Sequence, residues 1–282
     1  MPELPEVETM VRGIRPHVTG RTIRRFAECP NTCKPISVIP PLRRLQKRLV
    51  DQSFIAVRRL GKRVVLDLSD GSSLVIEPRM TGLVLLDDPP DIDHLRLKWE
   101  LNGSGDYDSL CFWDRRGLGT VRLFEPEQLQ SHLGPGKLGT DALEMTISRW
   151  VEECSKSRRE IKVLLLDQKI VAGIGNLYAS EILHCAAINP TAEAGSVTPS
   201  GLERLAEAVQ TVLSMAIEYE GSTLGDGTYR TALNKHGRYQ NHHRAYMREG
   251  QACLMCQKGK IVRIVQAQRS TFFCPRCQKK RG

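Results

Sequence analysis

Four cysteines near the C-terminal end constrain the fold of this chain more than any other feature of its sequence. Cys253 and Cys256 form one C-x2-C pair, and Cys274 and Cys277 form a second pair after a spacer of 17 residues. Four thiolates at this spacing can close tetrahedrally on one Zn²⁺ from two facing turns. Redox-active or unligated thiols are the alternative, which two regularly spaced pairs in so short a module do not favour. The sequence therefore predicts one structural zinc ion per chain, within a compact module over residues 247–282.

The stretch between the two cysteine pairs has the pattern of a β-hairpin. Residues 260–265 and 269–273 are rich in β-branched and aromatic side chains, and the loop between them would present Arg269 at its tip. A zinc hairpin with basic residues is suited to clamp DNA. A ribbon with a purely structural role is the alternative.

Length and charge narrow the class of protein. The chain has 282 residues, enough for two domains, or one domain with appendages, and a substantial core. Lys and Arg number 41 against 32 Asp and Glu, and the formal charge of +9 favours a polyanionic partner such as nucleic acid. No stretch approaches the ~20 apolar residues that span a bilayer, and the acidic N-terminus lacks the features of a secretion signal. Because nine cysteines are an odd count for a disulfide framework, we expect an intracellular protein.

The rest of the sequence divides into a β-rich part and a helical part. Residues 1–133 contain short apolar runs between turn residues, which predict an antiparallel β-sandwich or barrel. These runs are 54–57, 63–68, 73–76, 83–86, 95–101, 110–113 and 121–123. Residues 134–140, rich in glycine, predict a linker. The expected fold class is therefore α+β with several domains: an N-terminal antiparallel β-sandwich, a helical domain and a C-terminal zinc-ribbon hairpin.

The helical domain is expected over residues 141–246. Apolar residues at three- and four-residue spacing predict its helices, at 141–153, 161–166, 177–185 and 202–219. Residues 221–246 are polar, and we interpret them as a loop or mobile element with few core residues.

The N-terminal segment, residues 2–8, places an amine beside three carboxylates. Met1 precedes a small residue, so we expect its removal, which would expose the nitrogen of Pro2. An α-amino group titrates near ~8, against ~10.4 for lysine, so it is a nucleophile at neutral pH. Attack on carbon forms a Schiff base, whose proton transfers need a carboxyl group, and Glu3 is the nearest candidate. The simpler alternative, which is compatible, is that prolines and acids here only start a helix.

A glycine-rich turn, residues 168–176, lies between two expected helices. Its glycines permit positive φ, and Asn176 can act as the N-cap of a helix that begins at Leu177. A helix N-terminus with nearby glycine amides also binds a phosphate oxygen well. An ordinary capped turn is the alternative.

Together these features resemble one family, the formamidopyrimidine-DNA glycosylases (Fpg). The motifs that carry the resemblance are PELPEVE at 2–8, LGK at 60–62, RMTG at 79–82, DRRGLG at 114–119, DQKIVAGIGNLYASE at 167–181 and QRSTFFCPRC at 268–277. The resemblance implies a helix-two-turn-helix in the helical domain. It also implies a base excision repair enzyme that removes oxidised purines and cuts the strand by β,δ-elimination. The implied partner is double-stranded DNA with oxidised bases or abasic sites, bound by a monomer inside a bacterial cell.

The resemblance also implies roles for individual residues. Pro2 matches the nucleophile that attacks C1′ of the sugar, and Glu3 matches the proton-transfer residue. Lys62 matches a lysine that contacts the lesion-site phosphate and assists the chemistry. Asn176 and Arg269 match residues that grip the phosphates flanking the flipped nucleotide.

Three further positions match residues that fill the space left by the flipped base. Met80 matches the void-filling methionine, and Arg116 matches the arginine that faces the orphaned cytosine. Leu118 stands where the family has phenylalanine, so apolar wedging replaces stacking. Residues 221–246 also depart from the family's base-capping loop, so ring-opened formamidopyrimidines are a better supported substrate class than 8-oxoguanine.

Two other functions are compatible with the sequence. Endonuclease VIII shares the architecture and acts on oxidised pyrimidines, but its N-terminal sequence differs from PELPEVE. A non-catalytic DNA-binding protein with this fold is the better interpretation if Met1 is retained, because acylation makes the Pro2 nitrogen a tertiary amide.

Overall fold

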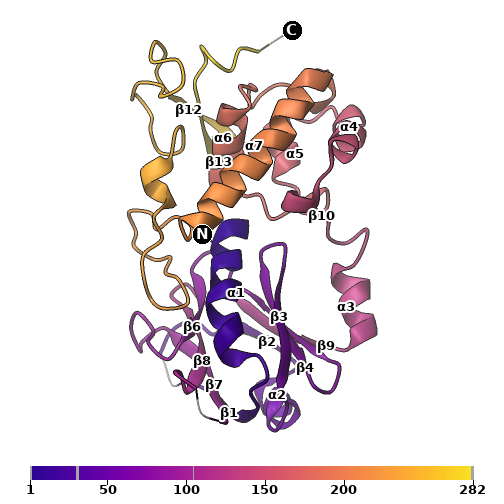
Figure 1. Cartoon of the computed structure of the whole chain (residues 1–282), viewed down its shortest axis with the longest axis vertical. Coiled ribbons are helices and arrows are strands. Elements are labelled where there is room, and N and C mark those ends of the chain that lie inside the picture. The colour runs from indigo at the N-terminus through magenta and orange to yellow at the C-terminus, as the bar shows by residue number, and fades with distance from the viewer. Residues whose placement is uncertain (1, 30–31, 104, 281–282) are drawn as a thin grey trace. The chain divides into compact units, whose positions relative to one another are not determined.

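A computed structural model describes residues 2–29, 32–103 and 105–280 (Figure 1). The chain forms two compact units. The first comprises Met1–Lys137 and Tyr219–Arg238, and the second comprises Leu138–Glu218 and Tyr239–Gly282. The boundary at Lys137 falls within the stretch that the sequence predicts as a linker.

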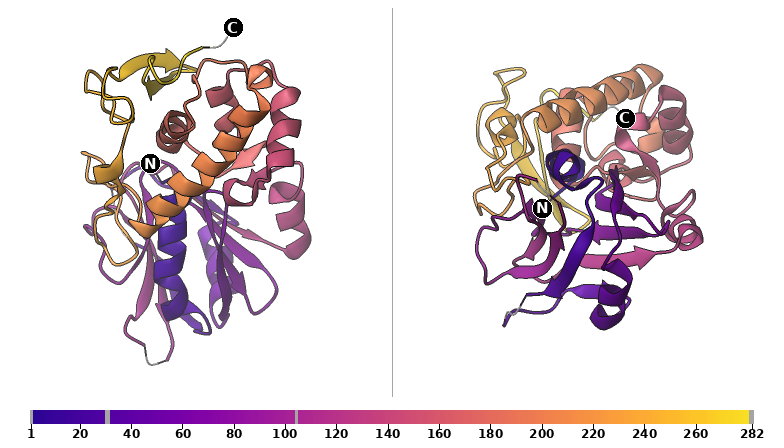
Figure 2. Two further views of the ribbon diagram at one scale, coloured as in Figure 1. Left: turned by 45° about the horizontal axis from the view of Figure 1, so that its top comes forward. Right: turned by 60° about the horizontal axis from the view of Figure 1, so that its bottom comes forward.

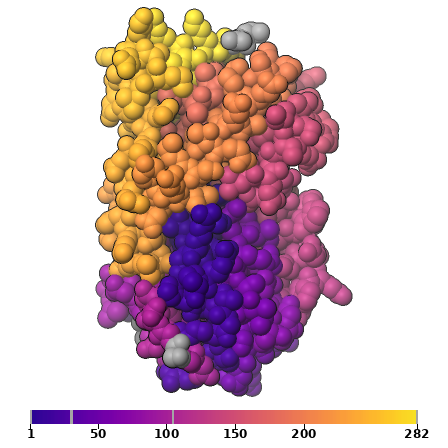
Figure 3. All heavy atoms as spheres, in the orientation of Figure 1, coloured from indigo at the N-terminus to yellow at the C-terminus, as the bar shows by residue number. Residues whose placement is uncertain are grey.

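The first unit begins with helix α1, Leu4–Val18. Pro5 lies in its first turn, where the missing N–H costs nothing, and Glu3 and Glu6 form a capping box. The apolar residues at helical spacing are buried against strands β3 Phe54–Leu60, β4 Arg63–Leu68 and β6 Gly82–Leu86. The exposed residues of the helix are mostly polar. Part of the helix reaches the surface, and Figure 2 shows its course beside the strands (Figures 2 and 3). Burial of one helix face fixes the end of the chain that carries Pro2.

Two sheets form the β-sandwich of the first unit, as the sequence predicts. The four-stranded sheet has the order β1-β7-β8-β6 and is antiparallel, with β1 Ile23–Glu28, β6 Gly82–Leu86, β7 Leu95–Leu101 and β8 Ser109–Asp114. The five-stranded sheet has the order β2-β9-β5-β4-β3, with β2 Ser37–Ile39, β3 Phe54–Leu60, β4 Arg63–Leu68, β5 Ser73–Glu77 and β9 Thr120–Phe124. Only the β2–β9 pair is parallel among the described strands of these sheets. Apolar residues from both sheets and α1 form one core.

Two helices of this unit are absent from the sequence prediction. Helix α2, Leu42–Leu49, is strongly basic and buries only Leu45 and Leu49. Helix α3, Pro126–Leu133, buries no residue completely. Its leucines pack on a small apolar cluster from strands β4, β5 and β9. The leucines of both helices lie at helical spacing, but each helix has only eight residues, so the pattern spans little more than two turns.

The segment Tyr219–Arg238 differs from its prediction as a core-poor part of the helical domain. It packs with the first unit, where Tyr229 and Ala232 are buried in the core. The Leu86 amide donates to the Ala232 carbonyl at 2.9 Å. A Cβ at Gly13 of α1 would lie 2.7 Å from the Ala232 Cβ, so this glycine makes room for the segment. Two isolated apolar residues in a polar stretch give no periodic signal.

Helices dominate the second unit. They are α4 Ile147–Ser155, α5 Ile161–Leu165, α6 Asn176–Cys185 and α7 Pro199–Glu218, with short 3₁₀ turns η1 Ala142–Glu144, η2 Ala194–Ser196 and η3 Tyr239–His242. Two short strands, β10 Thr140–Asp141 and β11 Val171–Ala172, pair in parallel. No helix in the described part of the chain combines the length and apolar character that a membrane span requires.

The hairpin of the zinc module also belongs to the second unit. Strands β12 Val262–Gln266 and β13 Arg269–Phe273 pair antiparallel, as predicted. Ala267 and Gln268 both have positive φ, which suits a two-residue turn between twisted strands. Strand β13 packs against α6, so the module is continuous with the helical part.

Candidate functional site

The head of α1 holds the predicted nucleophile and its carboxylates together. Pro2, Glu3 and Glu6 are buried. The Glu3 amide donates to Glu6 Oε2 at 2.9 Å, and the Glu3 side chain accepts from the Glu6 amide. These reciprocal bonds fix both carboxylates beside Pro2. Met1 lies outside the described residues, so its removal stays a prediction.

The segment that follows α7 is anchored at this same helix head. The Ser222 amide donates to Glu6 Oε1 at 2.9 Å. Gly221 has φ +77°, and a Cβ there would lie 2.9 Å from the Glu6 side chain, so the close approach requires glycine. The Tyr229 hydroxyl donates to the carbonyls of Glu6 and Glu220 at 3.4 and 3.1 Å. Burial raises the pKa of Tyr229 well above its ordinary value, so the hydroxyl remains a donor at neutral pH.

Lys62 occupies the tight turn between β3 and β4. Gly61 takes φ +58°, and Leu60 pairs with Arg63 across the turn. The lysine is half-buried. It belongs to the same unit as Pro2 and Glu3.

One buried carboxylate joins the two loops that carry the predicted void-filling residues. Asp114 is fully buried, and its Oδ1 accepts from the Thr81 hydroxyl and the Arg116 amide. Its Oδ2 accepts from the amides of Leu118 and Gly119, both at 2.8 Å. The structure therefore brings the turn of Met80 and the loop of Arg116 and Leu118 together as one body.

The void-filling side chains themselves point outward from this body. Met80 is 38% exposed, Arg116 is exposed and Leu118 is half-buried. An exposed methionine is unusual for an apolar side chain and suits a wedge. Asp114 and Thr81 were not singled out from the sequence, although both lie within the motifs RMTG and DRRGLG.

Asn176 has a different local role from the one predicted. Helix α6 begins at Asn176 itself, Gly175 is its N-cap, and no side chain caps it. The Asn176 Oδ1 instead accepts from Lys162 Nζ at 2.8 Å, and its Nδ2 donates to the Ser270 carbonyl at 3.0 Å. The N-cap prediction is therefore wrong, because the helix starts one residue earlier and the amide is held by tertiary contacts.

Lys162 is a residue of this site that the sequence pattern does not reveal. It is 1% exposed, and besides Asn176 it donates to the Ser270 carbonyl at 3.0 Å and the Thr271 hydroxyl at 2.7 Å. A buried ammonium requires such partners. The lysine thus ties the glycine-asparagine turn to β13 of the hairpin. Its helical neighbours Ile161 and Leu164 gave it the appearance of an ordinary helix residue.

Arg269 lies beside the tip of the hairpin and not at it, because Ala267 and Gln268 form the turn and Arg269 pairs with Gln266. It is exposed and is the first residue of β13 after the turn. It follows that Arg269 and Asn176 both lie on or beside the hairpin, within the second unit.

The four module cysteines form a cluster that fits one zinc ion. Their sulfur atoms all lie within 4.8 Å of one another. The Cys253–Cys277 and Cys256–Cys274 sulfur distances are 3.7 and 3.9 Å, and a tetrahedron with Zn–S bonds of about 2.3 Å has edges of about 3.8 Å. A Cβ at Gly259 would lie 2.7 Å from the Cys274 sulfur, so the adjoining turn also requires a glycine. The donor set and its spacing suit Zn²⁺.

A buried histidine lies against this cluster. His184 Nε2 is 3.3 Å from Cys253 Sγ, and its Nδ1 has no hydrogen-bond partner in the described part of the chain. Burial lowers the pKa of His184 to about 4, so the ring is neutral at pH 7. The proton then belongs on Nε2, which can donate to the thiolate. Such a bond supports a metal ligand from outside the coordination shell.

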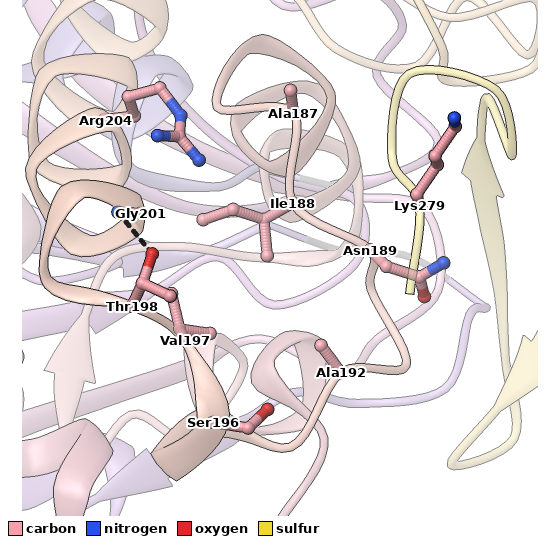
Figure 4. Close-up of a pocket in the computed structure, with 10 residues that line it drawn as sticks. All are labelled: Ala187, Ile188, Asn189, Ala192, Ser196, Val197, Thr198, Gly201, Arg204 and Lys279. Carbon is pink, nitrogen blue, oxygen red and sulfur yellow. Dashed lines mark hydrogen bonds between the residues drawn. The ribbon is translucent and has the colours of Figure 1, made fainter. Parts of the chain in front are cut away.

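A small hollow of about 50 Å³ lies elsewhere in the second unit, with Arg204 and Lys279 on opposite sides of it (Figure 4). Arg204 already donates to the carbonyls of Ala186 and Ser200. The hollow has room for little more than water. It includes none of the predicted site residues.

Three parts of the chain match models of known protein families. Residues 1–121 match the formamidopyrimidine-DNA glycosylase N-terminal domain, residues 137–227 its H2TH domain, and residues 253–280 a zinc finger found in Fpg and isoleucyl-tRNA synthetase. Formamidopyrimidine-DNA glycosylase of Chloroflexus aggregans is 38% identical over 99% of this chain and 98% of its own. That of Paracoccus denitrificans is 39% identical over 99% of this chain and its whole length.

Solved structures agree with the sequence relatives. Lactococcus lactis Fpg in complex with abasic-site DNA has a TM-score of 0.86 and 30% identity, over 99% of this chain and 100% of that one. MutM (Fpg) from Thermus thermophilus has a TM-score of 0.85 and 34% identity over the full length of both chains.

A β-sandwich with a Glu3–Glu6 capping box at the start of its first helix, an H2TH domain and a four-cysteine hairpin define a DNA glycosylase of the DNA repair class. The chain belongs to the formamidopyrimidine-DNA glycosylase family.

Proposed function

We propose that this protein is a bifunctional DNA glycosylase and AP lyase of base excision repair. The Pro2 nitrogen donates its lone pair to C1′ of the damaged nucleotide, and the bond from C1′ to the base breaks. The base leaves with that electron pair and takes up a proton, and the Pro2 nitrogen gives up its own proton. The nitrogen lone pair then forms a double bond to C1′ while the bond from C1′ to the ring oxygen O4′ breaks and O4′ takes up a proton, so the protein remains joined to the opened sugar as a Schiff base. Elimination of the 3′ and then the 5′ phosphate cuts the strand, and hydrolysis frees Pro2.

The observation that carries this proposal is the capping box at the head of α1. Proton transfer needs a carboxyl group held within reach of the amine. Glu3 adjoins Pro2, and its reciprocal bonds with Glu6 hold both side chains in place. Glu6 also receives the Ser222 amide, so the segment after α7 supports the same carboxylates. Glu3 is therefore assigned the proton transfers, and Glu6 a supporting role.

The other site residues take parts that suit their exposure. We assign Lys62 to the lesion-site phosphate and Arg269 and Asn176 to flanking phosphates. Met80 and Leu118 fill the vacated space, and Arg116 faces the orphaned base. Zn²⁺, held by the four cysteines, has no catalytic role, because four thiolates leave no open position.

The substrate class is oxidised purines in duplex DNA. Ring-opened formamidopyrimidines come first, because one solved relative, Lactococcus lactis Fpg, is described in complex with an N7-benzyl-Fapy-dG DNA. Residues 221–246 differ from the family's capping loop in sequence, so 8-oxoguanine is the second choice.

Borohydride trapping tests the nucleophile. Reduction during reaction with a lesion duplex makes the transient Schiff base permanent, and peptide mapping should place the DNA on Pro2. At pH 7.5 about a quarter of a reference α-amino group is unprotonated, compared with roughly 0.1% of a lysine. DNA mapped to Lys62 would overturn the nucleophile assignment while leaving a glycosylase.

The Glu3→Gln variant provides the matched chemical test. The amide keeps the size of the side chain but cannot transfer the proton, so the variant should bind lesion DNA and fail to excise. Intact mass of the protein shows whether Met1 is absent. Absence of Met1 with no adduct and no strand cleavage on any oxidised purine would support a non-catalytic DNA-binding protein instead.

A further inference from the structure

The outer face of the five-stranded sheet carries a hollow of about 290 Å³ that the proposed chemistry does not use. Side chains from β2, β4, β5, β9 and the end of α3 line it. Helix α3 covers the neighbouring part of this face, where Leu129 and Leu133 pack on Val65, Val75 and Phe124. The volume lies near the lower end of the range for small-ligand pockets, about 300–1,000 Å³.

Positive charge dominates the rim of this hollow. Arg63, Arg79 and Arg122 contribute three guanidinium groups against the single carboxylate of Glu77. Glu77 Oε1 lies 3.5 Å from Arg63 Nη2 and 3.2 Å from Arg79 Nε. Each guanidinium has five N–H donors, so most donors of both arginines are available to an anion.

Arg122 is arranged differently from the other two arginines. Its Cζ lies 4.5 Å from the centre of the Phe124 ring, and its Nη2 lies 3.2 Å from His132 Nε2. No carboxylate lies within 4.0 Å of it among the ion pairs of the described residues. The phenylalanine supports one face of the guanidinium plane, which leaves the opposite face for another flat group. Guanidinium planes of this kind stack on nucleobases.

The strand register sets the spacing between these two features. Val75 pairs with Arg122, and Glu77 lies two residues further along β5, so Glu77 and Arg122 are diagonal neighbours about 7–8 Å apart. In a nucleotide, the sugar separates the base from the phosphate by a comparable span. The apolar side chain of Val75 lies on this outer face between the two features, whereas the side chain of Val121 is buried in the core on the other face of the sheet.

We propose that this hollow binds one nucleotide of an unpaired DNA strand, with its base stacked on Arg122 and its phosphate held by Arg63 and Arg79. Arg63 directly follows Lys62, and Arg79 directly precedes Met80, so the hollow adjoins the turns assigned to the lesion. The site would hold an unpaired strand beside those turns. The inference rests on the proposed function only in taking DNA as the partner.

Anisotropy of a fluorescent single-stranded thymidine oligonucleotide tests this site. Arg122→Gln should raise the Kd about 5-fold to 100-fold, the loss expected for one stacked base. Arg122→Lys keeps the charge but not the plane, and it should lose most of the same affinity. Arg43→Gln is the matched control, because Arg43 is also an exposed arginine of the first unit but does not line the hollow. It should change the Kd by less than about twofold.

Two results would overturn the stacking site. Equal weakening by Arg122→Gln and Arg43→Gln would mean that only overall charge matters. Full affinity in Arg122→Lys would mean that the plane is not used. Unchanged thermal unfolding of both Arg122 variants is expected, and it shows that any loss is not caused by misfolding.

Competition experiments distinguish binding of the base from binding of the phosphate. Thymidine monophosphate should displace the oligonucleotide better than thymidine does, and equal displacement would exclude a phosphate at Arg63 and Arg79. Tighter binding of free thymidine monophosphate than of the strand would make this a free-nucleotide site and overturn the DNA assignment. Arg122→Gln should still form the borohydride adduct with an abasic duplex. If the parent protein forms no adduct, this result would contradict the proposed function but not the nucleotide site.

Discussion

Replacing Asp114 with asparagine tests whether one carboxylate holds both loops of the void-filling residues. Asparagine keeps one acceptor oxygen, which can serve either Thr81 and Arg116 or the amides of Leu118 and Gly119. Its NH2 group then faces two donors that have lost their acceptor. A hydrogen bond to a charged group contributes about 1.5–3 kcal/mol, so two such losses should lower the free energy of unfolding by about 3–6 kcal/mol.

Urea unfolding of Asp114→Asn and of a control, Asp93→Asn, measures this difference. Asp93 is exposed, so its change should stay within about 0.5 kcal/mol. Binding to abasic duplexes with cytosine or adenine opposite the site gives a second reading. Asp114→Asn should weaken the preference for cytosine, because the loop that positions Arg116 loses an anchor. Unfolding within about 1 kcal/mol of the parent, with the opposite-base preference intact, would refute this reasoning.

Four further predictions concern single residues. Burial lowers the pKa of His243 to about 4, so the unfolded state binds more protons as pH falls below about 6.5, and this residue should contribute about 2 kcal/mol to the loss of stability between pH 7 and 5. In urea unfolding, His243→Gln should make that loss smaller by about 2 kcal/mol, while the part due to His184 remains. Arg269→Ala should lower DNA affinity and reduce the steepness of log K against log salt by about 0.9, because one cationic phosphate contact is lost. Asn176→Ala removes no charge and should lower affinity at constant slope. Equal slopes for Arg269→Ala and the parent protein would show that the arginine does not contact a phosphate. Cys274→Ser should reduce zinc content and weaken DNA binding, and metal analysis of the parent below half an equivalent, without chelator, would argue against the zinc site. Met80→Ala should slow excision from duplex DNA more than it weakens binding to an abasic site; a normal rate on a base-paired lesion would contradict the wedge.

The sequence predicts the elements of this fold wherever local pattern and burial agree. Strand β4 matches its predicted run, residues 63–68, because turn residues bound it on both sides. Helix α2 is absent from the prediction although Leu42, Leu45 and Leu49 have helical spacing, because eight residues provide only about two turns of pattern. Prediction from a sequence pattern needs several apolar residues at regular spacing. Short helices at the edge of a core bury few residues, so they provide too short a pattern.

The sequence predicts which residues belong to the candidate site, but it does not predict the contacts between them. Pro2, Arg269 and the cysteines could be placed from spacing and resemblance, since short motifs carry them. The partners of Asn176 could not, because Ser270 and Lys162 reach it from distant parts of the chain. Asp114 likewise acts through a loop 33 residues away. A tertiary hydrogen bond leaves no periodic trace in a sequence.

The return of Tyr219–Arg238 to the first unit has a consequence for synthesis on the ribosome. The β-sandwich strands end before Lys137, yet Ala232 and Tyr229 complete the core, and Ser222 completes the bonds of Glu6. About 100 further residues must therefore be made before the first unit can close, which takes roughly 5–20 s at typical elongation rates. During that interval the head of α1 lacks its final cover. The order of translation thus makes the chemistry of Pro2 and Glu3 one of the last features of the first unit to be assembled, after most of the second unit has been synthesised.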